Sequence, residues 1–234
     1  MLEYFGSTKV ESIDNSTYEG ATHILDMNKP LPLDLYGEFD TVIDGGSLEH
    51  IFNVPQALRN LSNLCRIGGQ IIHILPSNNF CGHGFWQFSP ELFISLYSTE
   101  HGYGETEVFL ADLSNSDKWF QVKKPIHGKR VNVRTSSEVY VLLRTVLLRR
   151  DFIHENIQQS DYVYEWNKAV FTAQPISSAD RLNFKKVIKR FPILYGVLSK
   201  IYYLYLRANM ERGLNNRNPG LTELVVRSRI SPLG

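Results

Sequence analysis

Acidic residues end three short apolar runs near the start of the chain. Each run is rich in β-favouring residues and stops where a loop would begin, at Asp14, at Asp26 and at Asp44. In an open α/β sheet, ligands bind beyond the carboxyl ends of the strands, where an acid can accept hydrogen bonds from ribose hydroxyls. A single Asp in such a place more often forms a turn or caps a helix. Three of them at successive strand ends favour a ligand site.

Two histidines and a glutamate are the candidates for proton transfer. Glu49 and His50 follow the third run, and His83 lies in a polar loop further along the chain. Histidine titrates near neutral pH, so His50 and His83 are the predicted bases, with Glu49 as their rival. His50 could instead bond the backbone at the start of a helix, and His73, inside an apolar run, is expected to be structural. Because the spacing differs from His-Glu-x-x-His, no metal site is predicted.

The loop after residue 76 carries side chains that suit a polar ligand. It is rich in glycine and contains amides, an imidazole and an aromatic ring, which are groups that a pocket uses to bind a sugar. The predicted substrate-binding residues are Asn78, Asn79, Trp86 and Gln87. The alternative is a packed loop in which the glycines only make turns.

Alternating strands and helices must position these residues. Asn53 is a good N-cap for a helix over Val54–Cys65, whose apolar residues follow the helical period. Gly68 and Gly69 are expected to end that helix. Gln70–Leu75 is a continuous apolar run, which is typical of a buried strand in a parallel sheet. Strand, helix and strand joined by short loops predict an α/β fold, with a Rossmann-like, mainly parallel sheet flanked by helices.

The second half of the chain shows a different pattern. Glu105–Asp112 and Glu138–Leu148 have the composition of long strands and are expected to pair antiparallel at one edge of the sheet. From Ala179 onward the pattern is helical and basic, with a helix expected over 181–212 that Pro192 bends or interrupts. We therefore divide the chain into a Rossmann-like domain over residues 1–175 and a basic helical C-terminal appendage over residues 176–234.

The order of elements between residues 10 and 76 resembles that of class I S-adenosylmethionine-dependent methyltransferases, in particular methyltransferase type 11 domains. The segments that carry the resemblance are Val10-Glu-Ser-Ile-Asp-Asn-Ser, His23-Ile-Leu-Asp-Met-Asn, Phe39-Asp-Thr-Val-Ile-Asp-Gly-Gly-Ser-Leu-Glu-His-Ile and Arg66-Ile-Gly-Gly-Gln-Ile-Ile-His-Ile-Leu-Pro. By topology the resemblance extends to about Leu148. It implies an enzyme that uses S-adenosylmethionine to methylate a small polar acceptor.

The resemblance also assigns roles to individual residues. The cofactor-binding residues that it implies are Asp14, Asp26, Met27, Asp44, Gly45 and Gly46. In the family, the first of these acids holds the ribose, the second binds the adenine amine, and the loop that begins at the third borders the methionine moiety and the substrate. The segment 77–93 is similar to a stretch of methyltransferases associated with bacterial surface-sugar gene sets, so the expected acceptor is a sugar or a surface-polysaccharide precursor.

One part of the family pattern is missing. The first strand and its glycine-rich loop, which cradle the methionine end of the cofactor, should precede Val10, but no Gly-x-Gly motif stands before it. The resemblance therefore predicts a fold that is truncated at the N-terminus. Either a longer gene product supplies the missing part or the cofactor site is impaired.

Composition excludes several other classes of protein. The chain is 43% hydrophobic and 21% charged, which is typical of a folded domain and argues against disorder or a coiled coil. It has two cysteines and no secretory leader pattern, so we expect a cytoplasmic protein. No phosphate-binding Walker loop, hydrolase nucleophile elbow or nucleic-acid-binding module is present in the sequence.

Charge is distributed unevenly, although the formal net charge is only +1. Residues 1–50 hold ten acids against two bases, whereas residues 179–234 hold eleven bases against three acids. A basic, aromatic-rich tail could lie on an anionic membrane surface, or it could pack against the sheet or a second copy of the chain. The alternative function is therefore a non-catalytic methyltransferase-like binding protein or a membrane-associated partner.

Overall fold

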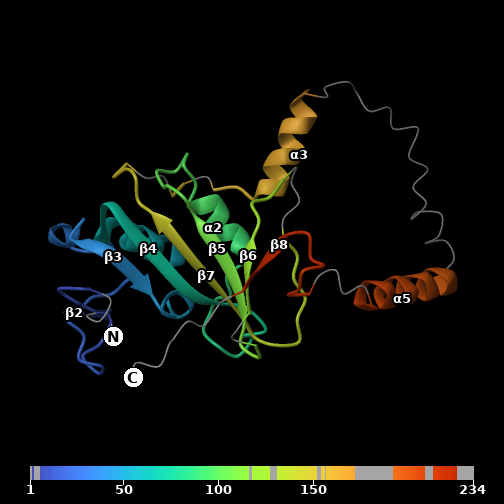
Figure 1. Cartoon of the computed structure of the whole chain (residues 1–234), viewed down its shortest axis with the longest axis horizontal. Coiled ribbons are helices and arrows are strands. Elements are labelled where there is room, and N and C mark those ends of the chain that lie inside the picture. Colours follow the sequence, from blue (N-terminus) through green and yellow to red (C-terminus); the bar gives the residue numbers. More distant parts are fainter. Residues whose placement is uncertain are drawn as a thin grey trace.

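A six-stranded mixed sheet forms the centre of an α/β fold (Figure 1). The computed structural model describes residues 2, 6–115, 118–126, 131–151, 154–155, 157–171, 192–208 and 213–225. The strand order is β3-β4-β7-β5-β6-β8. The bounds of the strands are β3 Phe39–Asp44, β4 Cys65–Asn78, β5 Glu107–Asp112, β6 Lys118–Val122, β7 Val139–Val146 and β8 Leu221–Val225.

Strand directions correct the predicted sheet. β3 and β4 pair in parallel, but β7 pairs antiparallel with both β4 and β5, and β6 pairs antiparallel with both β5 and β8. The described sheet is therefore mostly antiparallel, and the expected mainly parallel Rossmann-like sheet is not confirmed. β3, β4 and β5 nevertheless share one direction, because β7 runs opposite to both β4 and β5.

The first two predicted strands form a sheet of their own. β1 (Ile13–Asp14) and β2 (His23–Ile24) pair in parallel as a two-stranded unit separate from the main sheet. Both contain two residues and are shorter than the strands that the sequence predicted over Val10–Ile13 and His23–Leu25. The loop after β2 is held to the rest of the fold through Asn60, whose buried amide donates to the carbonyl oxygens of Met27 and Lys29 at 3.1 and 2.8 Å.

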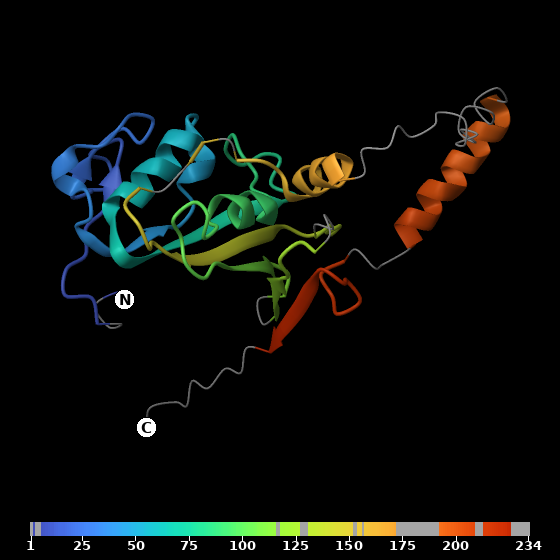
Figure 2. The same cartoon turned by 90° about the horizontal axis from the view of Figure 1, so that it is seen from above.

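Helices α1 (Val54–Leu64) and α2 (Pro90–Leu96) lie on the same face of the main sheet (Figure 2). The cap and the buried face of α1 are confirmed: the Asn53 side chain accepts a hydrogen bond from the Gln56 amide, and the predicted apolar positions are buried. Gly68 and Gly69 do not end the helix but lie inside β4, which begins at Cys65. Close packing explains Gly69, because a Cβ there would lie 2.8 Å from the Asp40 carbonyl oxygen.

The other face of the main sheet is partly open among the described residues. Side chains alternate along a strand, so Ile43 on β3 and Ile74 on β4 point away from the face that buries Ile71 and Leu75. Ile43 is 44% exposed and Ile74 is 38% exposed. The continuous apolar run over Gln70–Leu75 therefore forms a strand as predicted, but it is not buried on both faces in the described part of the chain.

The second half of the chain differs from prediction in the placement of its strands. β5 and β7 do pair antiparallel, but β7 lies between β4 and β5 rather than at an edge. β6 was not predicted, because Lys118–Val122 lies in a polar segment, rich in basic residues, between the two predicted strands. β8 was not predicted either, and it adds a strand from the C-terminal region to the edge of the sheet.

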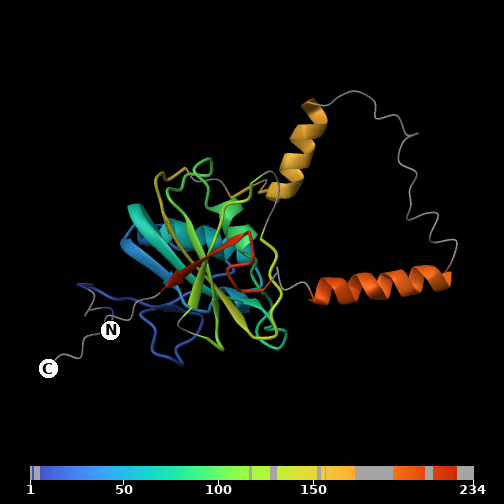
Figure 3. The ribbon, with the colours of Figure 1, turned by 45° about the vertical axis from the view of Figure 1, so that its right-hand side comes forward.

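The structure describes two further helices in the second half of the chain. α3 spans Ser160–Phe171, and α5 spans Pro192–Ala208. Pro192 is the first residue of α5, and the remaining parts of the expected helix, residues 181–191 and 209–212, lie outside the described residues. Figures 1 and 3 show α5 away from the sheet rather than packed on it. No helix among the described residues is long and apolar enough to cross a membrane.

Candidate functional site

The three predicted catalytic residues come together at the carboxyl ends of the parallel strands β3 and β4. Glu49 and His50 lie in the 3₁₀ turn η3 (Leu48–His50) after β3, and His83 lies in the loop after β4. Glu49 Oε1 is 3.4 Å from His83 Nε2 and 4.0 Å from His50 Nε2. The two imidazole rings meet edge to face, with 5.0 Å between their centroids. Both histidines are exposed, whereas the Glu49 side chain is 1% exposed.

Glycines allow the two loops to approach closely enough for this contact. Gly84 has a φ of +69°, and a Cβ on it would lie 2.7 Å from the Glu49 carbonyl oxygen. The next amide, that of Phe85, donates to the same oxygen at 2.7 Å. Trp86 adds a bond from its indole nitrogen to the Ile51 carbonyl oxygen at 3.0 Å. The loop after β4 is thereby fixed against the loop after β3.

Glu49 is the least compensated group of this cluster. Its Oε2 is buried and has no hydrogen-bond partner in the part of the chain that the structure describes. A buried carboxylate is costly unless hydrogen bonds or a positive charge offset its lost hydration. The two imidazoles beside Oε1 are the groups that can supply that charge, by binding a proton or by sharing a cation with the carboxylate.

A second buried network lies directly behind this cluster. His73 Nδ1 is 2.8 Å from Asp44 Oδ2, and His73 Nε2 is 2.8 Å from the Tyr97 hydroxyl. Asp44 also accepts from the amides of Ser47 and Leu48 at 3.0 and 3.3 Å. All three members of the network are buried, and burial raises the pKa of Tyr97 well above its usual value.

The sequence did not predict this network, and the network gives Asp44 a structural role instead of the predicted cofactor-binding role. Asp44 was expected to bind the cofactor, but its carboxylate is 3% exposed and shapes the loop that leads to Glu49. His73 is structural, as predicted. Its link to Tyr97 joins β4 to the residue that follows α2, and no local pattern in the sequence indicates such a distant pair. Gly45 and Gly46 remain in the exposed turn after β3.

Asp14 is the last residue of β1, and Asp26 lies two residues after β2, the parallel neighbour of β1. Asp14 Oδ1 accepts from the amide of Ser16 at 2.6 Å, and Asp26 Oδ1 accepts from the amide and the side chain of Asn28 at 3.0 and 2.9 Å. The bonds from Asn28, with the ammonium of Lys29 beside Asp26, lower the pKa of Asp26. Both acids therefore form local turns, and both keep solvent-accessible surface.

The loop after β2 lies next to the loop after β3. The Asn53 amide donates to Asn28 Oδ1 at 2.9 Å, and the Asn53 side chain donates to the Asn28 carbonyl oxygen at 3.2 Å. Met27 is packed partly against the core and lies between Asp26 and this contact. The predicted cofactor-binding and catalytic residues thus occupy adjoining loops.

The predicted substrate-binding side chains are engaged within the protein. Asn78 and Asn79 bond Thr135 and its neighbours, which ties the end of β4 to the segment before β7. Gln87 accepts from the Phe80 amide at 2.8 Å, and the Trp86 nitrogen is bonded as described above. These bonds favour the packed-loop alternative for the amides, while Trp86 is 40% exposed.

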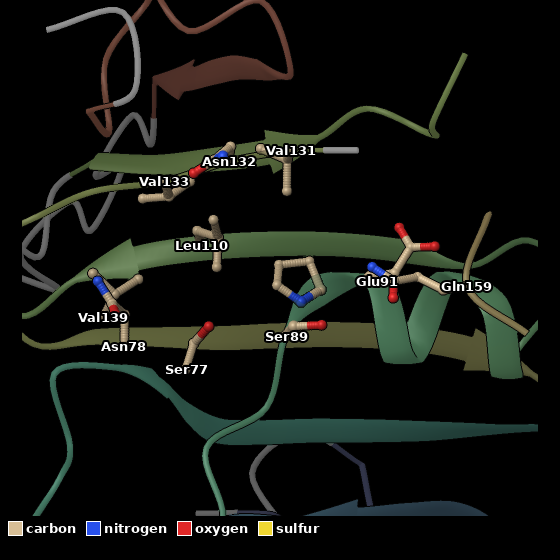
Figure 4. A pocket seen from close by; sticks show the side chains of 11 residues that line it. Ser77, Asn78, Ser89, Glu91, Leu110, Val131, Asn132, Val133, Val139 and Gln159 are labelled. Atoms are coloured by element: carbon tan, nitrogen blue, oxygen red, sulfur yellow. The ribbon is translucent and has the colours of Figure 1, made fainter. Parts of the chain in front are cut away.

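A cavity of about 420 Å³ opens beside the end of β4 and was not predicted (Figure 4). Leu110 and Val139 form an apolar floor, and Glu91 and Gln159 lie at one end. The full lining is Ser77, Asn78, Ser89, Pro90, Glu91, Leu110, Val131, Asn132, Val133, Val139 and Gln159. Of the predicted substrate-binding residues, only Asn78 lines this cavity. Because the lining comes from segments far apart in the chain, its assembly has no local sequence signal.

Comparison with known proteins adds no relative. The sequence matches no family model, and no curated protein matches it significantly.

Proposed function

We propose that this chain is a class I methyltransferase-like enzyme that transfers a methyl group from S-adenosylmethionine to a hydroxyl of a small polar acceptor. The acceptor that we propose is a sugar or a surface-polysaccharide precursor. The observation that carries the proposal is the gathering of Glu49, His50 and His83 at the carboxyl ends of β3 and β4, beside the loop that follows β2. Ligands of open α/β sheets bind at this edge.

The residues at the ends of β1 and β2 fit an adenosine. Asp14 and Asp26 are accessible acids at or just after the ends of two adjacent parallel strands, and local turns rather than buried partners hold their carboxylates. We assign the ribose hydroxyls to Asp14 and the adenine amine to Asp26, with Met27 beside the ring. Gly45 and Gly46, at the start of the loop after β3, would border the methionine part, while Asp44 supports that loop from within.

The histidines provide the proton acceptor that a hydroxyl nucleophile needs. When bound, S-adenosylmethionine supplies an electrophilic methyl group on its sulfonium. His83 or His50 accepts the proton that the acceptor hydroxyl loses, and Glu49 stabilises the imidazolium that results. Because both rings are exposed and Glu49 is buried, the carboxylate orients the bases without itself facing the acceptor.

Sheet topology supports the resemblance beyond the first four strands. β3, β4 and β5 run in one direction, and β7 runs in the opposite direction between β4 and β5. α1 connects β3 to β4 and α2 connects β4 to β5, and both helices lie on the same face of the sheet. β1 and β2 form a sheet separate from that of β3, and between the equivalent strands the family has its first strand and glycine-rich loop. Without that loop we expect S-adenosylmethionine to bind weakly.

A nuclear magnetic resonance titration of the whole chain with S-adenosylmethionine tests the cofactor site even when binding is weak. Amide shifts should saturate at Asp14, Asp26 and Met27, and Asp14→Ala should weaken binding by about 1–3 kcal/mol, the cost of unpaired polar groups. Asp34→Ala, at an exposed acid in the 3₁₀ turn Leu33–Leu35, is the matched control and should have no effect. An Asp14→Ala affinity equal to that of the control contradicts the ribose assignment.

One observation favours the alternative, a non-catalytic, membrane-associated protein. α5 presents apolar and aromatic side chains that are largely exposed, among them Val197, Ile201 and Leu204 at 50%, 56% and 63%. The preceding residues, 181–190, carry five bases, which suit an anionic lipid surface. In this alternative the protein acts at the cytoplasmic face of a membrane, and α5 lies in the interface.

A further inference from the structure

The cluster of Glu49, His50 and His83 has the dimensions of a metal-binding site. One ligand atom from each residue lies within 4.8 Å of the other two. Bonds of about 2.0–2.1 Å to a tetrahedral ion separate neighbouring ligand atoms by roughly 3.4 Å. The separation of Glu49 Oε1 from His83 Nε2 already equals that spacing, and the separation from His50 Nε2, at 4.0 Å, needs only a small rotation of an exposed ring.

The burial of Glu49 is a second observation that points to a cation. The side chain is 1% exposed, and its Oε2 is buried without a hydrogen-bond partner among the described residues. A solvated surface cluster would not need further compensation, but a buried carboxylate does. The unpaired oxygen belongs to the same carboxylate whose other oxygen faces both imidazoles, so one ion can satisfy the charge and join all three side chains.

We propose that Glu49, His50 and His83 bind a divalent transition-metal ion, with Zn²⁺ as the best fit. Two imidazole nitrogens and one carboxylate oxygen are a donor set that suits Zn²⁺ and related ions, and not the oxygen-rich shell that Ca²⁺ or Mg²⁺ requires. Both histidines are exposed, so the remaining coordination positions face solvent and can take a water or an acceptor oxygen. The sequence did not indicate this site, because two loops 33 residues apart supply its ligands.

Metal binding does not depend on the proposed methyl transfer, so either can fail alone. If the protein both binds the ion and transfers a methyl group, the histidines serve as metal ligands. An acceptor hydroxyl bound to the ion would then lose its proton more readily, because the ion lowers the pKa of the hydroxyl. The metal-free cluster retains the imidazoles as bases. Activity that requires added Zn²⁺ after treatment with a chelator distinguishes the two routes.

Calorimetry with the untagged, chelator-treated chain tests the site directly. Zn²⁺ should bind with one ion per chain, and Glu49→Gln, His50→Ala and His83→Ala should each weaken binding by about 100-fold or more. Co²⁺ should show visible absorption bands that the same three variants lose. His50 and His83 are exposed, and Gln keeps the shape of Glu, so thermal melting should show that all three variants fold.

Two matched controls separate this site from adventitious binding. His23→Ala disrupts a His–carboxylate pair outside the cluster, formed with Glu11 at 3.0 Å, and Cys81→Ser removes the exposed thiol of the loop that carries His83. Both should bind Zn²⁺ as the unaltered chain does, and Zn²⁺ should raise their melting temperature. The proposal is overturned if micromolar Zn²⁺ gives no binding, if Glu49→Gln binds as well as the unaltered chain, or if Cys81→Ser abolishes binding.

Discussion

Asp44 and Glu49 are buried carboxylates in the same loop with different surroundings. Asp44 accepts bonds from two backbone amides and contacts the His73 ring, so its charge is satisfied within the protein. Glu49 has only the imidazoles of His50 and His83 near one oxygen and no partner for the other among the described residues. The first carboxylate therefore holds the loop in shape, and the second is the one available for chemistry.

The hydrogen bond between His73 and Tyr97 should contribute measurably to stability. Tyr97→Phe leaves a buried imidazole nitrogen without its partner at 2.8 Å, and we expect the free energy of unfolding to fall by about 1–3 kcal/mol. Urea titration followed by fluorescence measures the change. Tyr18→Phe, at a tyrosine that is 91% exposed, is the control. Equal stability of the two variants would show that the buried network is dispensable.

Acid should destabilise the fold through His154. Burial lowers the pKa of His154 to about 4, and the nearby charges of Arg59 and His101 act in the same direction. In the unfolded chain the pKa of this histidine is near 6.5. At pH values between about 6.5 and about 4, His154 therefore binds a proton in the unfolded chain but not in the folded chain, so the free energy of unfolding decreases as the pH falls. We expect this residue to account for about 2–3 kcal/mol of that loss.

A comparison of pH profiles checks this contribution. The free energy of unfolding of the unaltered chain and of His154→Gln should be measured at several values between pH 7 and pH 4. The variant should have a shallower decline, even if it is less stable at pH 7 because the contact of Tyr103 with His154 Nε2 is altered. Parallel profiles would mean that His154 does not sense pH in this range.

At the scale of elements, the site depends on the contact between the loop after β3 and the loop after β4. Gly84→Ala places a Cβ 2.7 Å from the Glu49 carbonyl oxygen at a φ of +69°, so the loop must move. We expect a loss of about 1–3 kcal/mol in stability and altered ring-proton resonances of His50 and His83. Gly82→Ala, whose Cβ would meet nothing within 4 Å, is the matched control.

The result for Gly84 has a clear alternative outcome. If Gly84→Ala melts at the same temperature as Gly82→Ala and leaves both histidine signals unchanged, the loops are not held together as described. In that case the proximity of Glu49 to His83 would not be a fixed property of the protein.

Sequence patterns predicted the local elements better than their assembly. The cap at Asn53, the buried face of α1 and the strand after it follow from periodicity and capping, which act over a few residues. Strand order depends on pairs distant in sequence, so the position of β7 between β4 and β5 and the pairing of β8 with β6 were not predictable. The same holds for the site: Glu49, His50 and His83 were each identified, but not their mutual contact.

At the scale of the whole molecule, α5 is the element whose role is least tied to the sheet. Its exposed apolar surface and the bases before it predict binding to vesicles that contain anionic lipid. Binding should weaken as salt increases, because each base contributes roughly 1 kcal/mol of attraction that salt screens. Co-sedimentation with anionic and neutral vesicles at low and high salt measures this.

Point substitutions are better suited to this test than truncation. Removal of residues 179–234 would also remove β8, which pairs with β6 in the main sheet. Ile201→Ser with Leu204→Ser reduces the exposed apolar surface of α5 and should reduce vesicle binding, while Leu113→Ser, at an exposed leucine after β5, should not. If anionic vesicles bind none of these proteins at low salt, α5 contacts a protein, and sedimentation mass then reports self-association.

The proposed function places the methyl group of S-adenosylmethionine against the Glu49–His50–His83 cluster. The most direct test uses cofactor labelled with ¹³C at that methyl group and detects its proton–proton contacts with the protein by nuclear magnetic resonance at millimolar cofactor. We expect contacts between the methyl protons and the ring protons of His50 or His83, and we expect an excess of adenosine to abolish them by competing for the site. The proposed function is wrong if the methyl group contacts only other residues, or if no cofactor is bound at millimolar concentration.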